Sequence, residues 1–442
     1  MGTSCVARSE RNLIKEAFLL MIVKKMIRRL KENGLKATLV HYFNIIATFF
    51  INRIRSFAKN AKFFLPLKNY IVFECESDMD DNPRAVYEYM VENNYNKKYK
   101  FIWLVKNVPF CRQNYAQKNV VFISRSDPSA KNQFRLNYYL STAKIFVFSH
   151  PYWFNKRNKK QIIINTTHGT PFKGKTASSN LGDSFDYTLV ASEYTKPWFV
   201  KILNCDEKQA FVCSHPRNDF LFNNEKEQIL KQLFNWKSDE KVIMCMPTFK
   251  QSKYMHDCDA ADSYSLTVVD NENELIQLNK KLNDSKIHMI VKLHPLQSTD
   301  DLKLTGLSNI HYIQNSELFE KKIILYKLLG CCDALITDFS SVLFDYLELD
   351  RPIGFFTKYF DQYNRGYIMD NPKDYYVGES IDNFDALIEF VDNLKGNIDN
   401  YKEKRAQINS LVNRSEESSR CEAFVKNMFE LRNVYLDSLS EE

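Results

Sequence analysis

A histidine that is followed by small and basic residues stands just after an apolar run. Residues 162–164 are all isoleucine, and residues 168–175 read His-Gly-Thr-Pro-Phe-Lys-Gly-Lys. Glycine and proline interrupt regular structure, so we expect His168 on a loop at the carboxyl end of a strand. Open α/β sheets bind ligands at that edge, and Lys173 and Lys175 suit a substrate that carries phosphate. For one histidine alone, a capping or core role is the simpler interpretation.

Two more apolar runs in the chain end in polar residues. Residues 288–295 read His-Met-Ile-Val-Lys-Leu-His-Pro, and His294 is the last histidine of that run. Residues 334–341 read Ala-Leu-Ile-Thr-Asp-Phe-Ser-Ser and end in Asp338, Ser340 and Ser341. Three polar clusters at strand ends favour a single cleft that is lined by several loops.

The other polar residues at strand ends could bind phosphate. Ser340 and Ser341 precede an apolar helical run, so their hydroxyls and N–H groups could hold an anion, although serine is also an ordinary N-cap. Thr248 and Lys250 follow a strand and place a hydroxyl and a cation at the same sheet edge. Arg217 follows the run 211–213 and could hold a phosphate or a carboxylate, including one from its own neighbours.

Histidine can accept or donate a proton near neutral pH, because its ordinary pKa is about 6.5. One histidine could deprotonate an attacking hydroxyl, and a second, protonated one could neutralise a departing phosphate. Together with the Lys, Arg and Ser donors, this pattern indicates phosphoryl-group transfer. None of the ten cysteines forms a C-x-x-C pair, so we expect no zinc site. We also expect no tightly bound cofactor and no nucleic-acid partner, and leave the divalent-metal requirement open.

The alternation of predicted strands and helices from residue 70 onward indicates parallel sheets with helices on their faces. The first series has strands at 70–75, 101–105, 120–123, 145–148, 162–165 and 188–190, and the second at 242–246, 287–293, 310–313, 334–337 and 353–356. The predicted fold class is therefore α/β and GT-B-like, with two Rossmann-like domains that face a cleft. We place an acceptor-side domain at 67–205, a connector at 206–240, a donor-binding domain at 241–395 and closing helices at 396–442.

The excess of positive charge lies at the N-terminus. Residues 1–69 carry a net charge of +11, whereas the whole chain carries +7. Residues 37–52 are uncharged, which is short of the about 20 residues that a membrane span needs. Polar residues recur there at helical spacing, so we expect residues 1–66 to form basic amphipathic helices on an anionic membrane surface. The alternatives are that these helices pack on the protein itself or that the segment truly spans the membrane.

The motifs resemble, in this order, those of the CDP-glycerol glycerophosphotransferases, the teichoic acid primases and polymerases of bacteria. The motifs are His168-Gly-Thr-Pro-x-Lys173, Pro216-Arg-Asn-Asp219, Pro247-Thr-Phe249, Leu293-His-Pro295 and Thr337-Asp-Phe-Ser-Ser341, and the resemblance covers about residues 70–370. The resemblance implies a GT-B enzyme at the cytoplasmic face of the bacterial cell membrane, held there peripherally. It would move glycerol phosphate, or a similar polyol phosphate, from a CDP-polyol to a hydroxyl of a lipid-linked acceptor in teichoic acid or capsule-type synthesis, and release CMP.

The resemblance also implies roles for single residues. His168 matches the base histidine, His294 the histidine near the donor phosphates, and Ser340 and Ser341 the donor-phosphate loop. The expected donor-phosphate residues further include Thr248, Lys250 and Arg217, with Gly169, Thr170, Lys173 and Asp338 in support. Ser214-His215 stands where Gly-Tyr is commoner in the family. A GT-B sugar transferase or epimerase that uses a UDP-sugar, and a non-catalytic membrane adaptor, are the rival hypotheses.

Overall fold

The structure is a computed structural model of the full chain. It describes residues 65–150, 156–174, 181–236, 239–247, 266–292, 306–338, 340–358, 360, 366–414 and 419–441. The amphipathic helices expected within 1–66 therefore lie outside the described residues. Phe64–Arg125 and Tyr139–Glu442 form one compact unit, in which the two sheets and the site described below are found.

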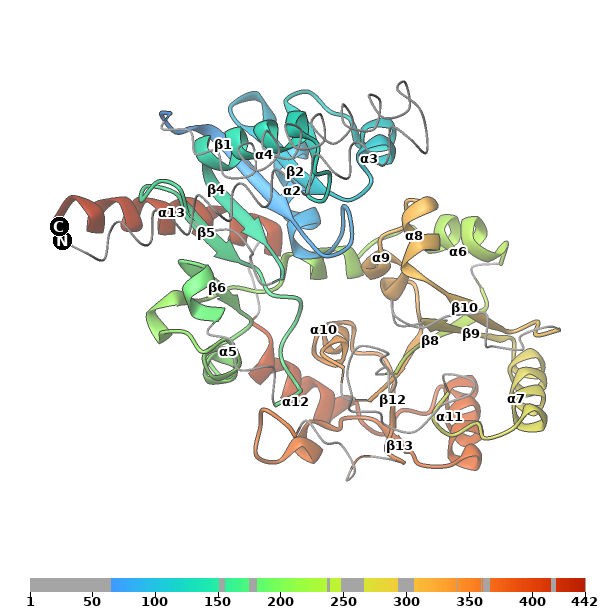
Figure 1. The fold of residues 1–442 in the computed structure, drawn as a ribbon. Helices are drawn as coiled ribbons and strands as arrows, with labels where there is room; N and C mark the ends of the chain where they lie inside the picture. Colours follow the sequence, from blue (N-terminus) through green and yellow to red (C-terminus); the bar gives the residue numbers. More distant parts are fainter. Residues whose placement is uncertain are drawn as a thin grey trace, which may run out of the picture. The chain divides into compact units, whose positions relative to one another are not determined.

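The first sheet has seven parallel strands in the order β3-β2-β1-β4-β5-β6-β7 (Figure 1). The strands are β1 (Lys68–Glu74), β2 (Lys100–Val105), β3 (Val120–Ser124), β4 (Ala143–Phe148), β5 (Ile162–Asn165), β6 (Tyr187–Val190) and β7 (Ala210–Val212). The central strands are nearly continuous apolar runs because helices cover both faces of a parallel sheet. The strand order reverses between β1 and β4, and loops at the carboxyl ends of such a pair line a ligand crevice.

The second sheet has six parallel strands in the order β10-β9-β8-β11-β12-β13. The strands are β8 (Lys241–Met246), β9 (Ile287–Lys292), β10 (Ile310–Ile313), β11 (Ala334–Thr337), β12 (Ile353–Phe356) and β13 (Glu379–Ile381). This is again the Rossmann order, and it reverses between β8 and β11. The predicted phosphate loop 338–341 follows β11, so it lies at this second reversal point.

The described residues of the chain form twelve α-helices. They are α2 (Asp81–Glu92), α3 (Val108–Tyr115), α4 (Ala130–Thr142), α5 (Lys196–Leu203), α6 (Lys226–Phe234), α7 (Glu272–Ser285), α8 (Asn315–Glu320), α9 (Leu325–Gly330), α10 (Val342–Tyr346), α11 (Phe384–Gly396), α12 (Lys402–Val412) and α13 (Arg420–Glu441). A 3-10 helix, η4 (Pro216–Leu221), follows β7. Among the described residues, no helix is both long enough and apolar enough to cross a membrane.

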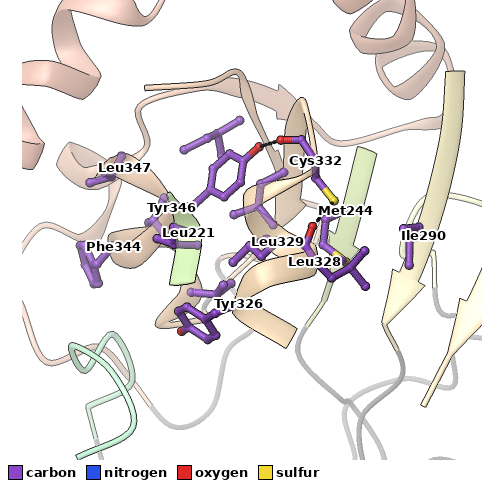
Figure 2. Close-up of a cluster of buried hydrophobic side chains, with 14 of the residues drawn as sticks. Leu221, Met244, Ile290, Tyr326, Leu328, Leu329, Cys332, Phe344, Tyr346 and Leu347 are labelled. Carbon is purple, nitrogen blue, oxygen red and sulfur yellow. Dashed lines mark hydrogen bonds between the residues drawn. The ribbon is translucent and has the colours of Figure 1, made fainter. Parts of the chain in front are cut away.

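Three large hydrophobic clusters among the described residues hold the sheets and helices together. In the first domain, Phe73 and Trp103 stack beneath α2, and Phe424 of α13 joins the same cluster. In the second domain, α7 and α11 pack beside one another on one face of the sheet (Figure 1). The cluster on its other face includes Met244, Leu329 and Phe344, and Figure 2 shows side chains of α9 and α10 meeting there. Figure 2 also shows the Tyr346 hydroxyl donating to the Cys332 carbonyl.

The predicted α/β, GT-B-like fold class is confirmed, and each predicted strand has a counterpart in the structure. Two strands were not predicted as such, β7 and β13, and each has only three residues at the edge of its sheet. β7 places residues 210–212 in the first sheet, whereas we expected the segment 206–240 to be a connector. α13 was expected among the closing helices at 396–442, and it packs on the core of the first sheet.

Candidate active site

The loop that carries His168 is tied to the neighbouring strand. The Thr166 N–H and hydroxyl both donate to the carbonyl of Phe148 at the end of β4, over 2.7 and 2.9 Å. The Asn165 side chain accepts from the Thr167 N–H over 3.0 Å, which makes a tight turn directly after β5. His168 therefore leaves the sheet at its carboxyl edge, as predicted.

The residues on both sides of His168 adopt left-handed backbone conformations. Thr167 has φ +54°, which is unusual for a β-branched residue, and Gly169 has φ +120°. A Cβ on Gly169 would come within 2.7 Å of Arg217 Nη2 and 2.8 Å of Ser341 Oγ. The loop thus brings the His168 backbone directly against two other predicted site residues, and glycine is required for that approach.

The His168 ring lies flat against the ring of His150, with centroids 4.8 Å apart and planes 8° from parallel. Its Nδ1 faces the Ser149 carbonyl oxygen at 3.4 Å. The side chain is exposed to solvent by area, yet the protein crowds it on several sides, as expected where a ring opens into a cleft. Desolvation by the surrounding protein is the main cause that lowers the pKa of His168, and the neighbouring His150 lowers it further. Asp81 opposes the change. Because water still reaches the ring, we expect a smaller shift than full burial would produce.

Arg217 is buried among protein partners. Its guanidinium donates to Asp81 over 2.6 Å, to Asp345 over 2.7 Å and to the His168 carbonyl over 2.9 Å. It also lies 4.4 Å from the centroid of the Tyr326 ring. The sequence predicted donor-phosphate binding for this arginine. With two carboxylates already on the guanidinium, the geometry favours a role in positioning the His168 loop.

Asn82 holds the same loop from the other side. It is fully buried, and its Nδ2 donates to the carbonyls of Thr166 and Thr167, both over 3.1 Å. Its Oδ1 accepts from the Arg217 N–H over 3.0 Å. One amide side chain therefore fixes the loop after β5 relative to η4. Asn82 was not predicted as a site residue, because nothing in the local pattern distinguishes it from an ordinary residue near a helix N-terminus.

Asp345 connects Arg217 to the second domain. It is fully buried and accepts from the Tyr326 hydroxyl over 2.5 Å and from Asn218 Nδ2 over 3.1 Å. Burial alone would raise the pKa of Asp345, but Arg217, His215 and the hydrogen bonds together lower it. The carboxylate is therefore charged at neutral pH and depends on Arg217 for compensation.

The serine pair lies where β11 turns into α10. The N–H groups of Leu343 and Phe344 donate to the carbonyls of Ser340 and Ser341, over 3.2 and 3.1 Å. The Ser341 side chain makes no capping hydrogen bond to the helix, so the alternative of a plain N-cap does not describe it. Its hydroxyl lies beside Gly169. Asp338, which precedes the pair, is buried.

The segment after His168 crosses to the second domain. Phe172 is buried in the cluster of the second sheet and stacks on Phe344, with ring centroids 5.7 Å apart. Lys173 forms an isolated antiparallel bridge with Tyr367. Thr170 is fully buried, and its hydroxyl has no hydrogen-bond partner among the described residues. Of the predicted residues, Lys173 therefore bridges the loop to the second domain and Thr170 is buried within the loop, while Thr248, Lys250 and His294 lie outside the described residues.

A cavity of about 390 Å³ opens beside His150. Its walls come from the loops after β1 and β4, where the first strand order reverses, and from the start of α8 and α9. The lining includes Glu76, Asp81, His150, Arg217, Gln314 and Tyr326. In the described part of the chain, no three His, Cys, Asp or Glu side chains gather closely enough to hold a metal ion.

His150 was not predicted as a site residue either, although the sequence carries a signal for it. Residues 145–151 read Ile-Phe-Val-Phe-Ser-His-Pro, which is one more apolar run that ends in His-Pro. The same argument that selected His294 would have selected His150. The structure places it at the carboxyl end of β4, next to the end of β5.

Two Rossmann-ordered parallel sheets, with polar loops meeting at their carboxyl edges, define a GT-B-like enzyme. The chain belongs to the family of CDP-Glycerol:Poly(glycerophosphate) glycerophosphotransferases, which matches residues 57–430. The family that the motifs led us to expect is therefore confirmed.

Relatives with assigned names support the same family. The chain is 27% identical over 377 residues to the teichoic acid glycerol-phosphate transferase of Staphylococcus aureus, covering 77% of this chain and 88% of the relative. It is 29% identical over 326 residues to the teichoic acid poly(glycerol phosphate) polymerase of Staphylococcus epidermidis. That match covers 67% of this chain but only 41% of the longer polymerase. Among solved structures, the wall teichoic acid polymerase TagF matches with a TM-score of 0.68 and 25% identity, over 91% of this chain and 98% of the other.

Proposed function

We propose that this protein transfers glycerol phosphate from CDP-glycerol to a hydroxyl of a growing or priming teichoic-acid-type polymer and releases CMP. One observation carries the proposal: Gly169 lies against Ser341, so the His168 loop meets the loop that the sequence predicts for the donor phosphates. Family membership supports the reaction class. A solved TagF variant soaked with CDPG matches this chain with a TM-score of 0.68 and 25% identity, which supports the donor.

His168 is the proposed general base. With Nδ1 turned to the Ser149 carbonyl, Nδ1 carries the hydrogen and Nε2 keeps its lone pair. Nε2 takes the proton of the acceptor hydroxyl, and the oxygen of that hydroxyl attacks the phosphorus of the glycerol phosphate group. The bond breaks between that phosphorus and the oxygen that joins the two phosphates of CDP-glycerol. The electron pair of this bond stays on the oxygen, which leaves as part of CMP. One phosphodiester bond forms for each phosphoanhydride bond broken.

Ser340 and Ser341 are the proposed donor-phosphate contacts, because hydroxyl and backbone N–H groups donate to phosphate oxygens without adding charge. His294, Thr248 and Lys250 keep the donor-side roles that the sequence suggests. His294, when protonated, would neutralise the leaving phosphate. Arg217 enters this proposal as a positioning residue, because Asp81 and Asp345 occupy its guanidinium.

The proposed acceptor is lipid-linked, since the named relatives are teichoic acid polymerases and primases. The net charge of +11 in residues 1–69 supports a peripheral location at an anionic, cytoplasmic membrane face. Basic residues near such a surface contribute about 1 kcal/mol each, and an apolar helix face adds to this independently of salt.

Identification of the released nucleotide tests the proposal. The purified protein is incubated with a synthetic lipid-linked glycerol-phosphate acceptor and, in separate reactions, with CDP-glycerol, CDP-ribitol or UDP-sugars. Acceptor-dependent release of CMP from CDP-glycerol supports the proposed reaction. Release from CDP-ribitol alone would change the donor polyol, and release of UDP alone would replace the proposal with a sugar transferase.

A further inference from the structure

His150 occupies a position that the proposed reaction does not yet use. It follows β4, which pairs with β5, so the loops that carry His150 and His168 leave the sheet side by side. Ser149 connects the two rings: its carbonyl faces His168 Nδ1 at 3.4 Å, and its hydroxyl lies 3.2 Å from His150 Nδ1. The nearly parallel rings, 4.8 Å apart, therefore form one stacked unit.

Glu76 fixes the outer edge of the stack. It follows β1, which pairs with β4, and its carboxylate lies 3.0 Å from His150 Nε2. Both nitrogens of His150 thus have partners, whereas His168 Nε2 is turned away from Ser149. Glu76 is mostly exposed, and ion pairs of that kind add little to the stability of a fold. The pair is better explained by what it does to His168 than by stabilisation of the protein.

We propose that His150, held by Glu76 and Ser149, is a positioning residue that sets the orientation and the protonation of His168. The inference depends on the proposed function only because it takes His168 as the general base. A positive charge on the His150 ring disfavours a second positive charge on the stacked His168 ring, so the pair favours the unprotonated His168 that can accept the acceptor proton. His150 also faces the cavity at the reversal point of the first sheet, where ligands of such sheets bind.

The charged groups around the stack agree with this arrangement. Glu76, Asp81 and Arg217 act on the rings from the end of β1, from α2 and from η4. Lys106, after β2, acts on Glu76, and His215 lies near His168. The hydrogen bond with His150 lowers the pKa of Glu76 to about 2, against an opposing effect of burial. Glu76 is therefore an anion near neutral pH that faces His150, while Asp81 is already engaged by Arg217.

The test is a titration of His168 itself, followed by NMR of isotope-labelled histidine side chains in the full-length protein. The chain has eight histidines, and the signal of His168 is identified as the one that disappears in His168→Gln. In His150→Phe, which keeps a stacked ring without charge, the pKa of His168 should rise. His150→Gln should do the same and covers the case in which phenylalanine packs poorly. His311→Phe, outside the cavity, is the matched control and should leave the His168 titration unchanged.

Enzyme kinetics separate this inference from the proposed function. In His150→Phe, the fall of kcat/KM on the acidic side should move to higher pH, with a loss of roughly three- to tenfold near pH 6. An unchanged His168 titration in both folded His150 variants would overturn the inference, even if His168→Ala is inactive. If the His168 titration shifts but the His168→Ala protein is active, His168 is not the general base. The inference that His150 positions His168 would still hold.

Discussion

Gly169 and Ser341 touch across 172 positions of sequence: a Cβ on Gly169 would lie 2.8 Å from Ser341 Oγ and 3.0 Å from its Cβ. The contact joins the loop after β5 of the first sheet to the loop after β11 of the second. It brings the proposed base and the proposed donor-phosphate serine into one site. The distance between base and donor therefore depends on the absence of a side chain at residue 169.

Gly169→Ala should strongly reduce transfer. The methyl group would strain a backbone with φ +120° and push apart Arg217 and Ser341. We expect a loss of about 1–3 kcal/mol in the free energy of unfolding. We expect kcat/KM to fall by about 10- to 100-fold, because small displacements of reacting groups are costly. Gly306→Ala is the control, since Gly306 has φ +90° and no neighbour within 4 Å. Equal activities of the two variants would show that the contact does not matter.

Arg217→Met should destabilise the whole fold. It would leave Asp345 fully buried without a cation, which costs about 3–5 kcal/mol in comparable cases. Adding Asp345→Asn should recover part of the loss, because the uncompensated charge is then removed. Lys208→Met, which breaks an exposed ion pair with Asp206, should have little effect on chemical denaturation. Normal stability of Arg217→Met with loss of CDP-glycerol binding would instead support the donor-phosphate role predicted from the sequence.

His215 should make the fold sensitive to acid. It is buried, neither ring nitrogen has a partner among the described residues, and burial lowers its pKa to about 4. The unfolded chain binds a proton near pH 6.5 and the folded chain does not, so stability falls as the pH drops from about 6.5 toward 4. At pH 5 this single group accounts for about 2 kcal/mol. His215→Phe should lose less stability than the wild type between pH 7 and pH 5 in urea denaturation. Parallel pH dependences of the two proteins would contradict this.

Deletion of residues 1–66 should release the protein from anionic liposomes. Full-length protein should float with the liposomes at low salt and only partly dissociate at high salt, because an apolar helix face inserts independently of charge. The truncated protein should remain in the soluble fraction and still bind CDP-glycerol. Equal flotation of both proteins would place the anchor elsewhere. Extraction of the full-length protein by detergent alone, and not by carbonate or salt, would indicate a true membrane span.

The sequence was sufficient to predict the strands near the site, because each is an apolar run that ends in punctuating or polar residues. It predicted His168 at a strand end for the same reason. The edge strands β7 and β13 were missed because three residues carry too little periodicity. The carboxylate partners of Arg217 could not be predicted, since Asp81 and Asp345 lie 136 and 128 residues away along the chain. Contacts of that kind depend on sheet order, which local patterns do not encode.

The most direct test of the account compares CMP release from CDP-glycerol by the wild-type protein and by His168→Ala, at equal concentrations of folded protein and with the same acceptor. Circular dichroism and chemical denaturation establish that both proteins are folded. The account predicts acceptor-dependent CMP release by the wild type and a rate about 10²- to 10⁴-fold lower in His168→Ala, the usual cost of losing a general base. Near-normal CMP release by the folded His168→Ala protein would contradict it.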